Sequence, residues 1–245
     1  MGCSMRRLLV FFMLIIPLIL YAGDFPHNNE SFSKAKKQMK QVYYDNQFSF
    51  YCDCIYDYKK EKGREKMVVY NDSCGYTPRK NKQRGKYIEW EHIMPAYRFA
   101  SHLECWNEEI CIDKNGKPYK GRKCCEKVDK SFRLMQADMY NLVPSVGELN
   151  GDRSNYEYGI IEGEARVYGE CDFEVSGKKA EPKDDIRGDI ARTYFYMEET
   201  YGITLTNEER QLFIMWDKMD NISQWEKIRA ERIKEIQGNE NKFIK

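Results

Sequence analysis

The chain has 245 residues, which is enough for one sizeable hydrophobic core. Its 40 Lys and Arg residues and 39 Asp and Glu residues leave a formal net charge of +1, so overall charge does not indicate a nucleic-acid partner. A basic surface on this protein would have to be local.

The N-terminus has the pattern of a secretory signal. Two arginines precede Leu8–Tyr21, fourteen uncharged residues that are too few for a comfortable membrane span and include Pro17. We therefore expect a signal peptide over residues 1–23 and a single domain over residues 24–245, with no stable membrane association once processed. An uncleaved anchor is the alternative, and a lipoprotein is disfavoured because Cys3 precedes the apolar run.

Eight cysteines remain after the signal, and export makes disulfides the default interpretation. Their spacing alone leaves 105 possible pairings open. Structural zinc is disfavoured because no pair has the usual Cys-x2-Cys ligand spacing. These cysteines are Cys52, Cys54, Cys74, Cys105, Cys111, Cys124, Cys125 and Cys171.

The first half of the domain alternates between helical and extended patterns. Ser31–Tyr44 carries apolar residues at helical spacing. Strands are expected at Phe48–Tyr51, at Met67–Tyr70 and at Tyr87–Ile93, the last ending before Pro95.

The middle of the chain is richer in turn-forming residues. Cys105–Asp129 holds four cysteines, two glycines and a proline, and predicts a long disulfide-held loop. Phe132–Tyr140 predicts a helix. Val143–Asn155 contains Pro144 and two glycines, and predicts an irregular segment with at most a short helix.

Three helices are expected to close the chain. The first is Gly188–Tyr201, and the next two open at the capping-box patterns of Thr206 with Glu209 and of Ser223 with Glu226. This order of helix, short strands, loop and helices predicts a compact α+β domain with a small antiparallel sheet.

His92 is the histidine whose surroundings best suit catalysis. It follows Glu91 at the end of a predicted strand and lies three residues before Pro95. Neighbouring strand residues point to opposite faces, so both side chains can serve one site only if the strand ends or twists there. Alone, this pair is a weak signal.

A second polar segment strengthens the signal from Glu91 and His92. Asn141–Asn155, with the sequence NLVPSVGELNGDRSN, combines asparagines and charged groups with apolar residues that would anchor it to the core. Two basic runs, Arg79–Lys86 and Lys114–Lys130, flank the Glu91–His92 strand in sequence. Phosphate contacts from such runs bind nucleic acid without reading its sequence, although lysine-rich loops are often only solvated surface.

Several of these segments together resemble the bacterial endonuclease I family of periplasmic and secreted nucleases. The resemblance runs through nearly the whole processed chain in one order. The matching segments are SFYCDC (Ser49–Cys54), CGY (Cys74–Tyr76), IEWEHIMPAYRF (Ile88–Phe99), FRLMQADMYNLVPSVGELNGDRSN (Phe132–Asn155), RGDIARTYFYM (Arg187–Met197) and WEKIRAERIKEIQGNENKF (Trp225–Phe243).

The resemblance implies a role for each matching residue. His92 corresponds to the general base, Glu91 and Asn150 to the two protein ligands of one divalent cation, and Arg122 to an arginine that contacts the scissile phosphate. The cation is expected to be Mg²⁺, with Mn²⁺ or Ca²⁺ open. A longer insertion, Asn107–Lys120, loosens the alignment around Arg122. The implied fold contains a ββα-metal motif.

The resemblance also implies a function and a disulfide pattern. We expect a monomeric, periplasmic or secreted endonuclease that cuts DNA and RNA without sequence preference and leaves 5′-phosphate ends. The implied pairs are Cys52 with Cys171, Cys54 with Cys74, and Cys105 with Cys125. Cys111 and Cys124 then remain for a local bridge, with exchange between the adjacent Cys124 and Cys125 left open.

Two other functions remain open from the sequence. One is a secreted, disulfide-rich protein that binds nucleic acid without cutting it. The other is a metal-independent ribonuclease in which His92 and a carboxylate such as Glu89 act as base and acid. A thiol oxidoreductase is remote because no Cys-x-x-Cys motif is present.

Overall fold

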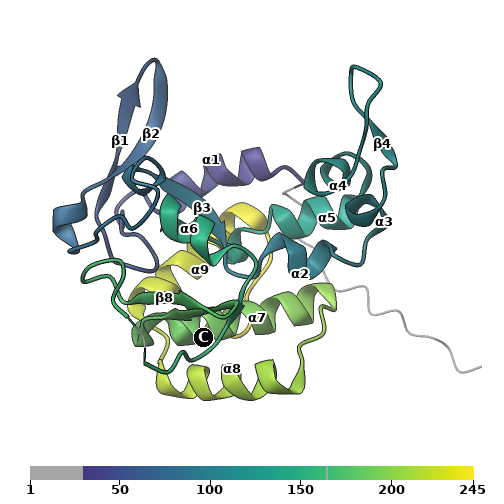
Figure 1. The fold of residues 1–245 in the computed structure, drawn as a ribbon. Helices are drawn as coiled ribbons and strands as arrows, with labels where there is room; N and C mark the ends of the chain where they lie inside the picture. The colour runs from purple at the N-terminus through teal and green to yellow at the C-terminus, as the bar shows by residue number, and fades with distance from the viewer. Residues whose placement is uncertain (1–29, 164) are drawn as a thin grey trace, which may run out of the picture.

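The computed structural model describes residues 30–163 and 165–245, so the expected signal at residues 1–23 lies outside the described residues (Figure 1). None of the described helices is long and apolar enough to cross a membrane. The helices are α1 Phe32–Val42, α2 Ala96–Ala100, α3 Glu104–Asn107, α4 Arg122–Val128, α5 Lys130–Gln136, α6 Gly147–Arg153, α7 Arg187–Tyr201, α8 Asn207–Met219 and α9 Gln224–Gln237.

Short strands accompany these helices, which confirms the predicted α+β class. Most pairs are antiparallel, whereas β7 pairs with β9 in parallel. The strands are β1 Tyr56–Glu61, β2 Arg64–Val69, β3 Ile88–His92, β4 Cys111–Ile112, β5 Pro118–Tyr119, β6 Leu142–Val146, β7 Glu157–Tyr158, β8 Phe173–Ser176 and β9 Lys179–Pro182.

The antiparallel pair β3–β6 lies at the centre of the fold. His92 faces Leu142 at one end of the pair, and Ile88 faces Val146 at the other. All five residues of β6 are buried, and α6 begins directly after it at Gly147. β3, β6 and α6 therefore form two antiparallel strands and a following helix, packed as one unit.

The prediction allowed at most a short helix in Val143–Asn155, and α6 is such a helix. The prediction that the rest is irregular is wrong, because the segment also holds most of β6. Pro144 fits in the strand because β6 pairs only with β3. The Pro144 carbonyl points to the open edge, where it accepts the backbone N–H of Phe50 at 2.7 Å. The N–H that proline lacks would also point to this open edge.

The predicted strand at Phe48–Tyr51 is also absent. Phe48 makes one isolated bridge to Ile55, and the chain then turns through Tyr51. The turn is set by the backbone N–H of Asp53, which donates to the Ser49 carbonyl at 2.9 Å. This local hydrogen bond takes the place of the cross-strand hydrogen bonds that a strand would make.

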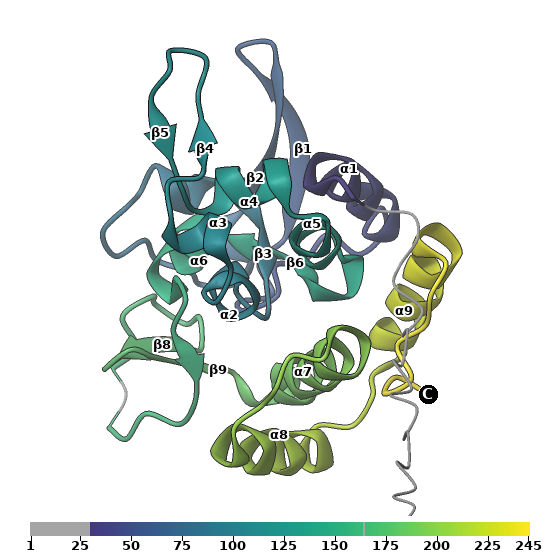
Figure 2. The same cartoon turned by 90° about the vertical axis from the view of Figure 1, so that its right-hand side faces the viewer.

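Two hairpins project from the same end of the molecule, with α1 between them in Figure 1 and both again at the top in Figure 2. The first is β1–β2, so the strand predicted at Met67–Tyr70 begins earlier, at Arg64, and has a partner that the sequence pattern did not reveal. Helices α7 and α8 lie at the opposite end.

The second hairpin, β4–β5, corrects the prediction of a long loop at Cys105–Asp129, which also contains α3 and α4. Asp113 turns this hairpin, because its carboxylate accepts the backbone N–H groups of Asn115 at 2.8 Å and Lys117 at 2.9 Å. Gly116 follows with a φ of +79°. The turn-forming residues thus build a hairpin.

The C-terminal helices match the prediction closely. Thr206 and Glu209 form a complete capping box at α8. Ser223 caps α9, but the Glu226 carboxylate binds the Arg192 guanidinium at 2.6 and 2.7 Å instead of closing a box. A tertiary ion pair therefore takes the place of the predicted local contact.

The eight cysteines form four disulfides, in the pairing that the family resemblance implied. Cys52–Cys171 joins positions 119 residues apart, and Cys54–Cys74 spans 20 residues. Cys105–Cys125 ties α3 to α4, and Cys111–Cys124 is the local bridge that ties β4 to α4.

Candidate functional site

His92 ends β3 and is only 5% exposed. Its imidazole lies against the ring of Phe32 at a centroid distance of 4.9 Å, and against Phe99 at 6.4 Å. Nε2 lies 2.8 Å from the backbone carbonyl oxygen of Gln136. Because a carbonyl can only accept, Nε2 carries the proton and Nδ1 keeps a free lone pair.

The protonation state of His92 follows from its surroundings. Burial lowers its pKa to about 3, and the positive charge of Arg122 acts in the same direction. The imidazole is therefore neutral at physiological pH and able to accept a proton.

Glu91 is also 5% exposed and is held from the side of α6. Its Oε1 accepts from Nη1 of Arg153 at 3.1 Å and from the Tyr51 hydroxyl at 3.5 Å. Burial raises the pKa of Glu91 to about 7, although Arg153 opposes this rise. Both of these side-chain contacts are made to Oε1.

Arg153 is the main site residue that the sequence did not reveal. It is fully buried, and it also donates to the carbonyl oxygens of His92 at 2.9 Å and Ile93 at 2.5 Å. It therefore supports both the end of β3 and the Glu91 carboxylate. The available signal was its spacing, because Arg153 follows Asn150 by one helical turn.

Asn150 lies on α6 and is oriented by Glu89. Its Nδ2 donates to Oε2 of Glu89 at 3.0 Å, and Glu89 accepts from Arg84 at 2.6 and 2.8 Å. A Cβ at Gly147 would lie 2.8 Å from Glu89 Oε1, and one at Gly151 would lie 2.0 Å from Arg84 Nη1. Glycine at these positions therefore allows the Arg84–Glu89 pair to approach α6.

Glu91 and Asn150 lie on β3 and α6, which pack against each other, but the two side chains do not contact each other directly. Glu89 and Glu91 share one face of β3, where residues two apart are about 6.6 Å from each other. Asn150 contacts the first, and Arg153 contacts the second. The amide oxygen of Asn150 is thus turned away from Glu89, on the helix that covers Glu91.

Arg122 begins α4 and reaches the same region from another direction. Its guanidinium lies 5.2 Å from the centroid of the Phe32 ring, and its Nε lies 3.9 Å from Glu126. Nη2 is buried with no hydrogen-bond partner among the described residues. Burial lowers the pKa of Arg122, while Glu126 and Glu91 oppose that change. A buried, unpaired guanidinium nitrogen is suited to an anionic ligand.

The basic run Arg79–Lys86 is partly used within the fold. Arg79 binds Asp152 at 2.8 Å, and Arg84 binds Glu89. The backbone N–H groups at positions 79 and 80 donate to Glu148. Part of this run therefore holds α6 in place.

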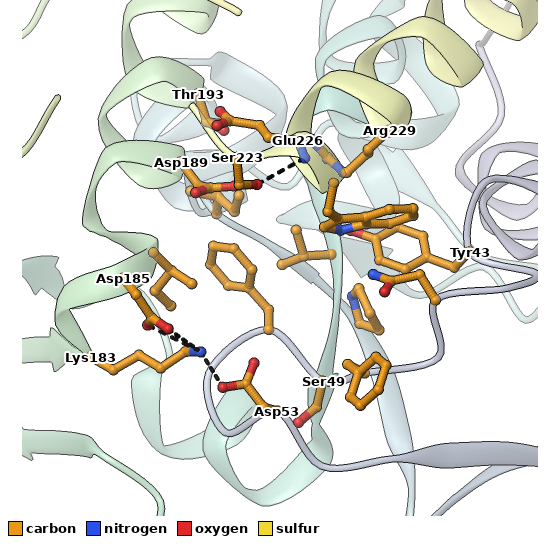
Figure 3. Close-up of a pocket in the computed structure, with 18 residues that line it drawn as sticks. Tyr43, Ser49, Asp53, Lys183, Asp185, Asp189, Thr193, Ser223, Glu226 and Arg229 are labelled. Atoms are coloured by element: carbon orange, nitrogen blue, oxygen red, sulfur yellow. Dashed lines mark hydrogen bonds and ion pairs between the residues drawn. The ribbon is translucent and has the colours of Figure 1, made fainter. Parts of the chain in front are cut away.

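A separate cavity of about 240 Å³ contains none of the predicted site residues (Figure 3). Lys183 binds Asp53 and Asp185 on one side of it, and Ser223 caps α9 on the other. Burial raises the pKa of Asp189, a further lining residue, to about 8. This cavity has ion pairs but lacks a histidine or an activated nucleophile.

The described residues contain no group of three or more His, Cys, Asp or Glu side chains placed to hold a metal ion. A cation at Glu91 would therefore need the amide oxygen of Asn150, water or substrate oxygens as its other ligands. Such oxygen donors suit a hard cation that keeps several waters, and they do not suit zinc.

Comparison with known proteins identifies the family of this chain. The sequence model for endonuclease I matches residues 28–245. The chain is 40% identical to endonuclease-1 of Buchnera aphidicola subsp. Acyrthosiphon pisum, over 88% of this chain and 80% of the relative. It is 37% identical to an extracellular deoxyribonuclease of Aeromonas hydrophila, over 94% and 95%, and 39% identical to a periplasmic deoxyribonuclease of that organism, over 88% and 85%. The chain therefore belongs to the endonuclease I family.

Proposed function

We propose that this protein is an exported endonuclease that hydrolyses phosphodiester bonds with His92 as general base and with one divalent cation. The observation that carries the proposal is the imidazole of His92, which is fixed and neutral and lies near Arg122. Nη2 of Arg122 has no hydrogen-bond partner among the described residues. These two residues would supply a base and an anion-binding group, and the chain belongs to a family of nucleases.

The donor atoms fit a hard divalent cation, for which Mg²⁺ is the expected choice, with Mn²⁺ or Ca²⁺ open. Glu91 would supply Oε2, and Asn150 would supply the amide oxygen that its bond to Glu89 leaves free. When bound, the cation would polarise the phosphoryl group and stabilise charge on the leaving 3′-oxygen. It would also favour the ionised form of Glu91, whose pKa burial raises to about 7.

The chain's own groups then divide the reaction. The Gln136 carbonyl holds Nε2 of His92, so Nδ1 is the atom that takes a proton from the attacking water. A water molecule is small enough to reach a side chain that is only 5% exposed. Arg122 would bind the scissile phosphate and offset the negative charge that grows on it. The expected products have 5′-phosphate and 3′-hydroxyl ends.

The relatives guide the choice of substrate and destination. Two of them carry the name deoxyribonuclease, with an extracellular or periplasmic location. We assign DNA as the substrate, RNA as a second one, and the periplasm or medium as the destination of a monomeric enzyme. The four disulfides suit such an oxidising compartment.

The decisive experiment combines plasmid cleavage with one substitution and a matched control. We expect cutting with Mg²⁺ and none with EDTA. His92→Ala should abolish cutting while it retains DNA binding, and His102→Ala, at an exposed histidine, should cut normally. Full cleavage by the His92 variant, or cleavage that persists in EDTA, would refute the mechanism.

The same assay separates the alternatives. Tight DNA binding with no cleavage under any metal would identify a binding protein. A metal-independent ribonuclease would spare DNA and leave 2′,3′-cyclic ends on RNA. Glu89 is a poor acid for that reaction, because its carboxylate is already held by Arg84 and Asn150.

A further inference from the structure

A basic groove lies between the β4–β5 hairpin and α4. Its volume is about 700 Å³, and it is lined by six cationic side chains and one carboxylate. The lining residues are Ile112, Asp113, Lys114, Lys117, Pro118, Tyr119, Lys120, Arg122, Lys123 and Lys127. We call this surface the basic groove.

Three lysines of the basic groove have no ion-pair partner in the described part of the chain. Lys114, Lys117 and Lys123 are exposed, and none of them forms an ion pair with a described residue. The lone carboxylate, Asp113, is committed to backbone N–H groups of its own turn. In the Arg79–Lys86 run, by contrast, two arginines are already paired. The groove therefore presents a surplus of unpaired cations.

The groove is also held in a defined shape. Its strands are only two residues long, and so short a hairpin is not stable by itself. Cys111–Cys124 ties β4 to α4, and Cys105–Cys125 ties α3 to α4. The cross-links keep the lysines of the hairpin beside the lysines of the helix, so that they form one surface.

Arg122 connects the groove to the candidate site. It lines the groove, and its guanidinium lies 5.2 Å from the centroid of the Phe32 ring, against which the His92 imidazole also lies, at 4.9 Å. A polyanion bound at Arg122 would therefore continue into the groove. DNA carries about one negative charge per 1.7 Å of its axis, which suits a row of fixed cations that leads away from the site of cleavage.

We propose that the basic groove binds backbone phosphates of duplex DNA to one side of the cleaved bond, without reading the base sequence. The proposal rests on the proposed function, because it takes DNA as the substrate. It assigns a role to the Asn107–Lys120 insertion: Lys114 and Lys117, together with Lys123, act as a flanking phosphate subsite.

The test compares two triple variants that remove the same charge. The groove variant is Lys114→Gln, Lys117→Gln and Lys123→Gln. The control is Lys179→Gln, Lys218→Gln and Lys227→Gln, at exposed positions on β9, α8 and α9. Helix α8 lies at the end opposite the hairpins (Figure 1). Both are made in the His92→Ala background, and binding of a labelled 24-base-pair duplex is measured in EDTA across a salt series.

The slope of log K against log salt reports the number of phosphates neutralised, at about 0.9 per contact. The groove variant should lower the magnitude of this slope by about 2 to 3, and the control by less than 1. Equal changes in the two variants, or an unchanged slope in the groove variant, would overturn the proposal. Equal melting temperatures and the absence of free thiols would confirm that both variants are folded.

A cleavage assay with the active enzyme adds a second readout. A duplex of about 6 base pairs is too short to occupy both the site and the groove, whereas 24 base pairs can occupy both. In a wild-type His92 background, the groove variant should lose kcat/KM at least tenfold on the long duplex and less than twofold on the short one. Equal loss on both would contradict a flanking subsite. If wild type cuts nothing but the salt slopes differ as expected, the proposed function fails while phosphate binding by the groove stands.

Discussion

Replacing Cys52 and Cys171 with alanine should destabilise this protein more than the same replacement of Cys111 and Cys124. The first bridge closes a loop over 119 residues, and the second closes one over 13 residues. All four cysteines are buried, so both variants lose a similar amount of packed sulfur. The difference between the two variants therefore isolates the effect of loop length.

The magnitude follows from the chain entropy that each bridge removes from the unfolded state. A loop of 13 residues corresponds to about 3 kcal/mol, and one of 119 residues to about 5 kcal/mol. Cys54–Cys74 and Cys105–Cys125 lie inside the longer loop and shorten its effective length. The shortening reduces the larger figure by only about 0.4 kcal/mol, because the dependence on length is logarithmic. A difference of about 1.5 to 2 kcal/mol is expected.

Equilibrium unfolding in guanidinium chloride, without reductant, measures this difference. Each variant retains three bridges, which thiol titration and mass spectrometry verify before unfolding. Comparable m-values would show that the transitions are comparable. Equal losses of stability, or a greater loss in the Cys111–Cys124 variant, would refute the entropic reasoning and indicate that native-state contacts dominate.

Three further predictions concern the site and its supports. Glu89→Ala should weaken Mn²⁺ binding by 10- to 100-fold in a titration, because the Asn150 amide loses its orienting acceptor; unchanged affinity would contradict that role. Arg153→Met should lower the free energy of unfolding by about 3 to 5 kcal/mol, because it leaves Glu91 buried without its cation; a loss below 1 kcal/mol in urea unfolding would argue against that pair. Burial raises the pKa of Asp189 to about 8, so its contribution to stability is full below pH 4 and is lost as pH rises to 8. Asp189→Asn should therefore become more stable relative to wild type between pH 5 and pH 8, and a constant difference in urea unfolding would contradict this.

Part of the candidate site could be predicted from the sequence because its residues lie close together along the chain. Glu91 and His92 are adjacent, and Pro95 marked the end of their strand. Asn150 stood in a polar segment with apolar anchors, and family resemblance connected it to the other two. The support residues were not visible in this way. Arg153, Gln136 and Tyr51 act through contacts with residues 40 to 62 positions away.

The errors in the predicted fold have a related cause. Pro144 and the glycines around it suggested irregular structure, because local propensity disfavours them in strands and helices. Pairing of β6 with β3 outweighed that preference and left the proline on an open edge. At Phe48–Tyr51 the aromatic residues favoured a strand, but a turn and the nearby disulfide decided the backbone path.

The sequence by itself determined the α+β class, the C-terminal helices, the oxidised cysteines and the chemical types of the candidate catalytic groups. These depend on periodicity, composition and short motifs, which are written along the chain. Only the tertiary structure decided which nitrogen of His92 is free, which carboxylate orients Asn150 and which lysines remain unpaired in the basic groove. Each of those depends on the position and burial of groups brought together from distant segments, since desolvation and hydrogen bonding act through space.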